Sequence, residues 1–405
     1  MNHTLKSLLL ISIFKNVIND NIISSFISFI RKLTSNDNIE DALTSYAEFI
    51  YKLYCSTENQ NLYEYLKDLI YKDENILSHG CTCCIEKNNQ ILETARYELY
   101  LFSELLHYDY KRIKDEFITK FPESKDIIEH LPTFYTNKEV NFNLEDIIKS
   151  YTTKGYGVFS CYSAFKYNEK KEIIPIKYFD SITFNDLKNY EYQKDIIKKN
   201  TKAFIENKEA NNILLYGDRG CGKSSTVKAL INEFKEYNLK IIQVYKESFI
   251  YLSDLYEKLR TQPLKFIIFA DDISFDEDEK NFSSIKATLE GSLTNKPSNA
   301  IIYATTNRMH LVKESFSSRE GSEVHYNDTI DELVSLSDRF GIMLTFSSLT
   351  KNEYLDIVKK IASDCCVKID DNLLKEAEKF AALKAIRTPR VARQFINDYI
   401  ASEEK

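Results

Sequence analysis

The residues with the clearest chemical meaning are Gly217-Asp-Arg-Gly-Cys-Gly222-Lys223-Ser224, which fit the pattern G-x-x-x-x-G-K-[ST]. Glycines let peptide N–H groups turn inward around phosphate oxygens. Lys223 offers a flexible cation to the β- and γ-phosphates, and the Ser224 hydroxyl is a ligand for Mg²⁺. The apolar run NILLY precedes the loop and an amphipathic helix is expected after it, which is the context that this motif requires. We therefore predict that the loop binds the phosphates of ATP together with Mg²⁺.

The candidate nucleotide contacts extend one residue into the following helix. They are Gly217, Asp218, Arg219, Gly220, Cys221, Gly222, Lys223, Ser224 and Ser225. A chance glycine turn is the alternative, but only 9 of 405 residues are glycine. A random match to the full motif is expected roughly a hundredth of a time per chain. The N–H groups of the loop would lower the pKa of the Cys221 thiol, although a tolerated small residue is the simpler interpretation.

Two further polar clusters follow apolar runs that are typical of buried strands. Asp271 and Asp272 come directly after Phe266–Ala270, and Asn307 follows Ala300–Thr305. Ligands of open α/β sheets lie at the carboxyl ends of the strands. Asp271 would hold Mg²⁺ directly or through water, Asp272 would orient and partly deprotonate the attacking water, and Asn307 would hold that water or touch the γ-phosphate. The alternatives are acids that solubilise a loop and an asparagine that caps a turn.

The elements that must position these residues alternate between strands and helices from about residue 189 onward. Expected strands are Asn212–Tyr216, Lys240–Val244, Phe266–Ala270, Ala300–Thr305 and Ile342–Phe346; expected helices are Ser225–Tyr237, Leu252–Arg260 and Phe282–Leu293. Such alternation predicts a parallel sheet covered on both faces. After Phe346 the capping box Thr350–Glu353 opens a helix, and Asn372–Lys384 and Pro389–Ser402 add two more.

The fold class is therefore α/β, a phosphate-loop core with a parallel sheet between helices. We expect an N-terminal helical domain at 1–150, a linker or short strand pair at 151–188, the nucleotide-binding core at 189–346 and a helical lid at 347–405. The formal net charge of −7 argues against whole-chain attraction to nucleic acid. No apolar run approaches the roughly 18 residues that span a membrane, so we expect a cytoplasmic protein without a membrane partner.

Together these motifs resemble the AAA+ ATPase superfamily. The resemblance makes Gly217–Ser224 its Walker A motif, Phe266–Asp272 its Walker B motif and Asn307 its sensor 1; the usual Walker B motif ends Asp-Glu, whereas this one ends Asp-Asp. A second resemblance, to an uncharacterised family of predicted AAA+ ATPases common in Firmicutes, covers roughly residues 150–405. The stretches that carry it include NNILLYGDRGCGKSSTVKAL, FADDISFDEDE and IYATTNRMHLVKESF.

The superfamily resemblance also implies roles for residues outside the central motifs. Ser335-Leu-Ser-Asp-Arg339-Phe-Gly is similar to the arginine-finger region of AAA+ initiators, so Arg339 would reach a nucleotide held by a neighbouring subunit; the alternative is a surface arginine paired with Asp338. Arg390, after Thr388 and Pro389, resembles sensor 2, with Arg387 and Arg393 as competitors. Tyr190 lies in the segment that the superfamily places near adenine.

One feature of the N-terminal region stands apart. His79, Cys81, Cys83 and Cys84 lie close together and would bind Zn²⁺ if they converged, but their spacing is not that of common zinc folds. A helix–helix loop with incidental cysteines is the alternative.

The resulting hypothesis is a Mg²⁺-dependent ATPase, a homo-oligomer in a ring or open assembly, that remodels or switches a protein or nucleoprotein partner. The alternative is a nucleotide-gated loader or adaptor associated with DNA and having little turnover; whether it touches DNA directly stays open. A third hypothesis is a structural protein that has lost its activity and binds ATP only for stability.

Overall fold

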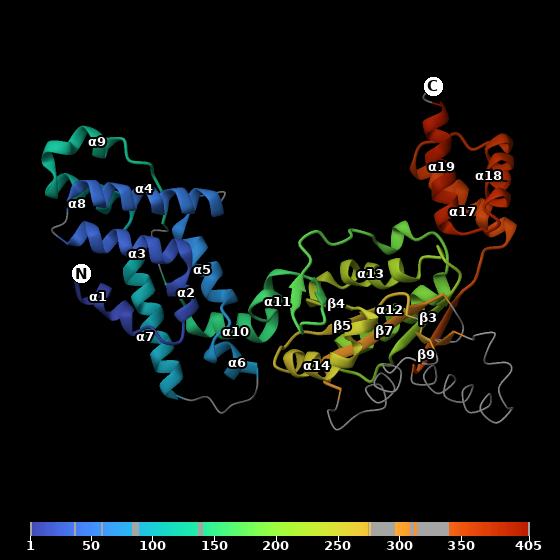
Figure 1. Cartoon of the computed structure of the whole chain (residues 1–405), viewed down its shortest axis with the longest axis horizontal. Helices are drawn as coiled ribbons and strands as arrows, with labels where there is room; N and C mark the ends of the chain where they lie inside the picture. The colour runs from blue at the N-terminus through green and yellow to red at the C-terminus, as the bar shows by residue number, and fades with distance from the viewer. Residues whose placement is uncertain are drawn as a thin grey trace. The chain divides into compact units, whose positions relative to one another are not determined.

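The computed structural model describes residues 2–35, 38–57, 60–82, 89–136, 141–273, 275–276, 296–307, 312–313 and 340–403 (Figure 1). The chain divides into two compact units, one comprising Met1–Cys161 and Thr261–Pro263, the other Tyr162–Arg260 and Leu264–Lys405. The helix expected at Phe282–Leu293 and the candidate Arg339 lie outside the described residues. No helix among the described residues is long and apolar enough to cross a membrane.

The first unit is built from helices. They are α1 (Asn2–Ser7), α2 (Lys15–Asn19), α3 (Asn21–Thr34), α4 (Ile39–Ser56), α5 (Leu62–Lys72), α6 (Ile76–Thr82), α7 (Asn89–Leu106), α8 (Tyr110–Lys120), α9 (Lys125–Glu129), α10 (Leu144–Lys154) and α11 (Val158–Cys161), with 3₁₀ turns η1 (Leu8–Leu10) and η2 (Pro122–Ser124). Asparagine and aspartate side chains set several helix starts. Asp20, for example, accepts hydrogen bonds from Ile22 N and Ile23 N at the start of α3.

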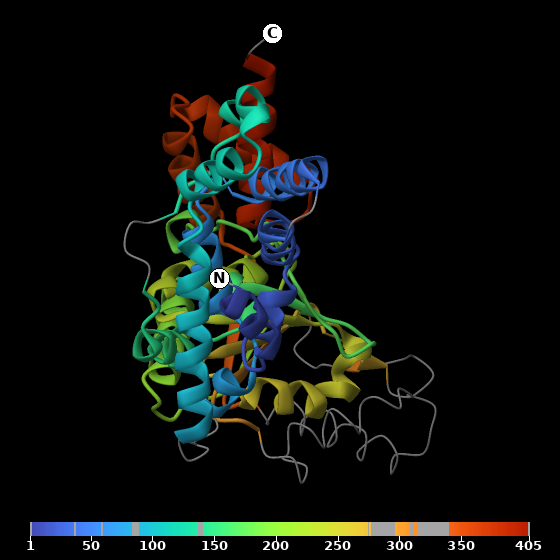
Figure 2. The same cartoon turned by 90° about the vertical axis from the view of Figure 1, so that its left-hand side faces the viewer.

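Aromatic side chains fill the core of this unit. Helices α3 and α4 lie side by side (Figures 1 and 2), and rings from both meet between them. The ring centroids of Phe26 and Phe49 are 4.7 Å apart, and those of Phe29 and Tyr46 are 5.1 Å apart. All four side chains are buried, so these aromatic residues form the core and do not offer faces for base stacking.

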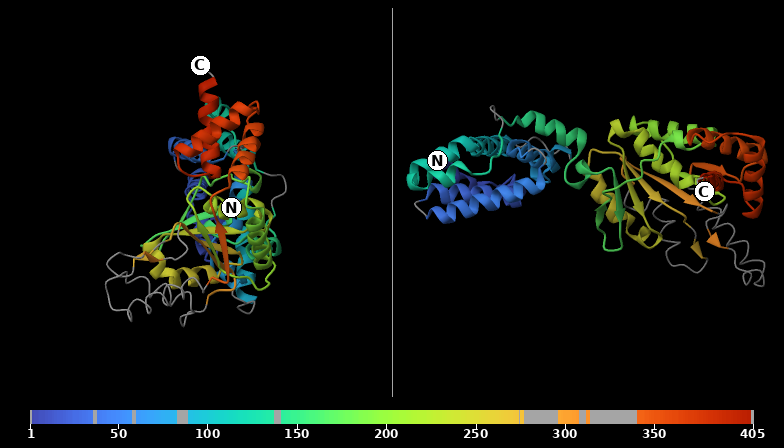
Figure 3. Two further views of the ribbon diagram at one scale, coloured as in Figure 1. Left: turned by 90° about the vertical axis from the view of Figure 1, so that its right-hand side faces the viewer. Right: turned by 90° about the horizontal axis from the view of Figure 1, so that it is seen from above.

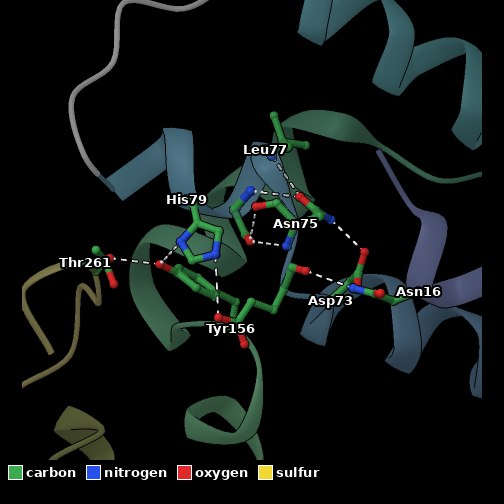
Figure 4. A network of polar contacts seen from close by, with 9 residues as sticks. Asn16, Asp73, Asn75, Leu77, His79, Tyr156 and Thr261 are labelled. Carbon is green, nitrogen blue, oxygen red and sulfur yellow. Dashed lines mark hydrogen bonds and ion pairs between the residues drawn. The ribbon is translucent and has the colours of Figure 1, made fainter. Parts of the chain in front are cut away.

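A buried polar network fixes the start of α6 (Figure 4). Asn75 Oδ1 accepts hydrogen bonds from the backbone N–H groups of the first turn, and Asn75 Nδ2 donates to Asp73 Oδ2 over 2.7 Å. Asn16 Nδ2 donates to the other carboxylate oxygen over 3.0 Å. In the same picture the Tyr156 hydroxyl donates to the Thr261 carbonyl over 3.0 Å, which ties the short segment Thr261–Pro263 to this unit.

A seven-stranded sheet forms the centre of the second unit, in the order β2-β1-β4-β5-β7-β3-β9. The strands are β1 (Ala164–Tyr167), β2 (Ile173–Pro175), β3 (Ile213–Gly217), β4 (Lys240–Val244), β5 (Phe266–Ala270), β7 (Ala300–Thr306) and β9 (Ile342–Phe346). All neighbouring pairs are parallel except β1 and β2. Short strands β6 (Phe275–Asp276) and β8 (Val312–Lys313) pair separately. The five strands expected from the sequence are confirmed within one residue at each end.

Helices cover both faces of this sheet, as the strand order requires. They are α12 (Glu191–Ile205), α13 (Lys223–Glu233) and α14 (Leu252–Arg260), with 3₁₀ turns η3 (Phe184–Asp186), η4 (Lys235–Tyr237) and η5 (Lys246–Tyr251). The connection from β3 to β4 runs along the strand order in one direction, and the connection from β4 to β5 runs in the opposite direction. Right-handed crossovers that run in opposite directions place their helices on opposite faces, and α13 and α14 lie on opposite faces of the sheet (Figure 1). Strands β5 and β7 are accordingly buried along their whole length.

The chain ends in three packed helices, α17 (Lys351–Asp364), α18 (Asp371–Leu383) and α19 (Pro389–Glu403), drawn orange to red in Figure 3. The expected capping box is present, since the Glu353 carboxylate accepts from Thr350 N over 2.8 Å and the Thr350 hydroxyl accepts from Glu353 N over 3.4 Å. Buried apolar residues from all three helices form a separate small core. The predicted fold class is confirmed: an α/β phosphate-loop core with a helical lid and an N-terminal helical region.

Candidate functional site

The carboxyl ends of β3, β5 and β7 open onto one cavity of about 330 Å³. Because β7 lies between β3 and β5, the loops that follow all three strands meet at the same edge of the sheet. The cavity is lined by Arg219, Gly220, Gly222, Lys223, Ser224, Ser225, Asp271, Asp272, Thr305, Asn307 and Arg390. Most of the candidate residues therefore converge, although they come from segments far apart in the sequence.

The phosphate loop begins where β3 runs closely along β9. Gly217 has a φ of +133°, and a Cβ atom there would lie 2.1 Å from the Phe346 carbonyl oxygen. Asp218 N donates to the same oxygen over 3.0 Å, so the ladder between the strands continues into the loop. No other residue fits this position, because both the backbone conformation and the contact exclude a side chain.

Lys223 is the buried cation of the site. Its ammonium donates to the carbonyl oxygens of Gly217 and Asp218, over 2.7 Å and 2.8 Å, and to Asn307 Oδ1 over 3.0 Å. Burial lowers the pKa of Lys223, and the nearby Cys221 and Asp272 partly oppose that shift. The three acceptors hold the ammonium at the mouth of the loop, where a phosphate group would meet it.

The two acids have different surroundings. The Ser224 hydroxyl donates to Asp271 Oδ1 over 2.5 Å, which joins the start of α13 to the end of β5. Asp272 accepts at Oδ1 a hydrogen bond from Asn307 Nδ2 over 2.5 Å. The backbone of Asp272 is left-handed, with φ +51°, a conformation that aspartate and asparagine tolerate better than most residues. The aspartate that ends this motif thus matches the local backbone.

Thr305 lines the cavity and was missed as a candidate in the sequence. It belongs to the last residues of β7, its side chain is buried, and its hydroxyl contacts Asp271. The available signal was a pair of threonines between the apolar strand and Asn307. Strand-end polarity alone did not show which of the two hydroxyls faces the acids.

The lid touches the phosphate loop directly. Arg390 lines the cavity, and its backbone N–H donates to the Gly220 carbonyl over 3.4 Å. Asp218 Oδ2 accepts hydrogen bonds from Ser348 N over 2.9 Å and from Ser348 Oγ over 2.5 Å, just before α17 begins. The competing Arg387 instead approaches Glu378 of α18, at 3.7 Å.

Among the candidates that the structure describes, four do not line the cavity: Gly217, Asp218, Cys221 and Tyr190. The Tyr190 hydroxyl donates to the Ser347 carbonyl over 2.6 Å, and its ring lies 4.8 Å from that of Phe346. Burial raises the pKa of the buried Cys221 thiol, so the lowering considered from the sequence is wrong. Arg393, like Arg387, does not line the cavity.

The oxygen donors of the site fit a Mg²⁺ ion. Ser224 Oγ and Asp271 Oδ1 are hard ligands that already lie together, and Mg²⁺ bound with a nucleotide needs few protein ligands beyond the phosphates. In the part of the chain that the structure describes, no group of three His, Cys, Asp or Glu side chains is placed to hold a metal. Of the cysteine cluster, Cys83 and Cys84 lie outside that part, and His79 Nδ1 contacts the Tyr156 hydroxyl at 3.1 Å.

Three comparisons relate the chain to known proteins. A family described as "Protein of unknown function (DUF815)" matches residues 160–403. Nucleoside triphosphatase I of Amsacta moorei entomopoxvirus is 25% identical over 176 residues, which cover 42% of this chain and 26% of that protein. The chain thus spans about a quarter of the length of that relative.

Two variants of RuvB from Thermotoga maritima are similar solved structures. Each is 18% identical and covers 55% of this chain; the shares of their own chains are 66% and 67%, with TM-scores of 0.36 and 0.37. The family match extends over more than half of this chain and includes all seven strands of the sheet and the lid. The chain therefore belongs to the DUF815 family, which confirms the resemblance to an uncharacterised family over roughly residues 150–405.

Proposed function

We propose that the protein binds ATP with Mg²⁺ and hydrolyses it. The observation that carries this proposal is the convergence of Lys223, Ser224, Asp271, Asp272 and Asn307 on one cavity. A cation, a hydroxyl, two carboxylates and an amide are the groups that phosphoryl transfer to water uses. The match to a nucleoside triphosphatase supports the same class of reaction.

The roles of the side chains follow from their contacts. Lys223 would bind the terminal phosphates, because its ammonium is buried at the mouth of the loop and gains from a negatively charged partner. Asp272 would accept a proton from the attacking water, and Asn307, which donates to its carboxylate, would orient both. Ser224 and Asp271 would hold the Mg²⁺, which neutralises charge that develops on the phosphates.

The wider assembly is part of the same proposal. Arg390 would contact the nucleotide from the lid, and Arg339 would contact it from a neighbouring subunit of a homo-oligomer. Closure of the lid on the nucleotide would change the surface offered to a macromolecular partner, a protein or nucleoprotein in the cytoplasm. The direct hydrogen bonds between the phosphate loop and the start of the lid support this coupling.

The test is ATP hydrolysis by the full chain with Lys223→Ala and Asp271→Ala variants. Each variant should lose at least about 100-fold in kcat/KM, because each removes charge that stabilises the transition state. Lys223→Ala should also lose nucleotide binding, whereas Asp271→Ala should retain it when Mg²⁺ is absent. Lys235→Ala, an exposed lysine in the 3₁₀ turn after α13, is the matched control. Wild-type rates in either site variant would contradict the proposal.

A second function, nucleotide-gated binding of a partner with little turnover, is favoured by one observation. Asp272 is the shorter acid, and Asn307 already engages its carboxylate. Hydrolysis measured against protein concentration separates the two functions. Specific activity that rises with concentration supports an ATPase assembly, whereas bound ATP with background turnover supports the gated module. A gel shift of duplex or single-stranded DNA that depends on ATP would identify DNA as its partner.

A further inference from the structure

We propose that Thr305 is a positioning residue that fixes both acids of the site; this inference deepens the proposed ATPase function and rests on it. Thr305 lies near the end of β7, with 1% of its surface exposed. Its hydroxyl donates to Asp271 Oδ1 over 2.7 Å and accepts the backbone N–H of Asp272 over 2.8 Å. Its carbonyl oxygen accepts the N–H of Ile273 over 2.8 Å. One residue thus holds three consecutive residues of the neighbouring segment.

The geometry explains why a hydroxyl is needed there. Strands β5 and β7 pair in register up to Ala270 and Ala304, and β5 ends at that pair. Asp272 then adopts a left-handed backbone, which the regular ladder cannot accommodate. The Thr305 hydroxyl fills the break, because it is donor and acceptor at once. Valine has the same shape but would leave the Asp272 N–H without this acceptor.

The contacts of Thr305 also orient the acid side chains. Ser224 and Thr305 donate to the same oxygen of Asp271, so the carboxylate is held from two elements at once. The fixed turn at Asp272 directs its own carboxylate toward Asn307. Asn307 Nδ2 donates to Asp272 Oδ1 over 2.5 Å. Loss of the hydroxyl would therefore loosen the ligand expected for Mg²⁺ and the expected base together, while the phosphate loop stays in place.

The test compares wild type, Thr305→Val and Thr305→Ser in the full chain by two measurements. The first is amide hydrogen exchange at Asp272 and Ile273 without nucleotide. Thr305→Val should accelerate exchange at Asp272 by about tenfold or more, because the N–H loses its side-chain acceptor. Thr305→Ser keeps the hydroxyl and should exchange within about threefold of the wild type. Exchange at wild-type rates in the valine variant would overturn the inference.

The second measurement is ATP hydrolysis at several Mg²⁺ concentrations. Thr305→Val should lower kcat by about 10- to 100-fold through misplacement of the acids, with KM changed by less than about threefold. Thr305→Ser should restore kcat. The control is Thr201→Val, which removes another buried hydroxyl of this unit, one that contacts the Tyr303 hydroxyl away from the cavity. Its kcat should stay at the wild-type value.

The two measurements separate this inference from the proposed function. If the wild type does not hydrolyse ATP, the proposed ATPase fails, and exchange at Asp272 still decides whether Thr305 holds the turn. If the wild type hydrolyses ATP and Thr305→Val retains its kcat, the ATPase stands and the positioning role is refuted. A fall in kcat that Thr305→Ser does not restore also refutes it, since the loss would then come from packing and not from the hydroxyl.

Discussion

Substitution of Gly220 by alanine tests whether the lid rests on the phosphate loop. Gly220 has a φ of +83°, and a Cβ atom there would lie 3.1 Å from Thr388 Oγ1 and 3.2 Å from Arg390 Cβ. Thr388 immediately precedes α19 and Arg390 lies in its first turn, and Thr388 is buried. The added methyl group therefore requires the loop or these neighbours to shift by a few tenths of an ångström.

The cost follows from two terms. A residue with a Cβ atom at a left-handed backbone position costs about 1–2 kcal/mol more than glycine. Overpacking against a buried neighbour adds about 1–2 kcal/mol when that neighbour must shift. The free energy of unfolding of this unit should therefore fall by about 2–4 kcal/mol, a sizeable share of the roughly 5–15 kcal/mol of a typical domain.

The assay is calorimetric unfolding of the full chain, with hydrogen exchange in α19 as a local readout. Gly80→Ala is the matched control, since it makes the same chemical change in α6 with no atom within 4 Å of the new Cβ. A helix-interior glycine replaced by alanine should gain about 0.5–1 kcal/mol. Wild-type stability and wild-type exchange in Gly220→Ala would refute the contact between lid and loop.

Two further predictions concern single side chains of the second unit. Burial lowers the pKa of Lys223 below the usual 10.5 of lysine, and a bound phosphate favours the charged ammonium. The affinity for an ATP analogue should therefore fall as the pH rises through that lowered pKa, because the ammonium loses its proton. Lys223→Arg should flatten the pH dependence of the measured Kd; equal slopes in both proteins would contradict this reasoning. The Tyr303 hydroxyl contacts Asn200 Nδ2 at 3.0 Å and Thr201 Oγ1 at 2.8 Å in the core, so Tyr303→Phe should lower the free energy of unfolding by about 1–3 kcal/mol. Tyr178→Phe, at a residue that is 95% exposed, should change that free energy by less than about 0.5 kcal/mol; a denaturant titration of both variants measures the two effects.

The order of elements in the core could be predicted from the sequence because buried parallel strands have a strong local signature. The run at β5 is continuously apolar and the structure buries all of it. The capping box at Thr350 could be predicted for a similar reason, since its partners are three residues apart. By contrast, the sequence signal was weak at β1, a strand of four residues that joins the sheet through pairing with β4, a segment distant in the chain.

The residues of the candidate site also differ in whether a local sequence pattern or a long-range contact identifies them. The sequence by itself identified the phosphate loop, the two acids and Asn307, because each of them lies just after an apolar run that predicts a strand. Only the tertiary structure decided that Thr305 holds both acids, that Arg390 and not Arg387 lines the cavity, and that the Cys221 thiol has a raised pKa. These properties depend on which residues distant in the sequence meet, and on how much water their contact excludes, and neither is contained in local spacing.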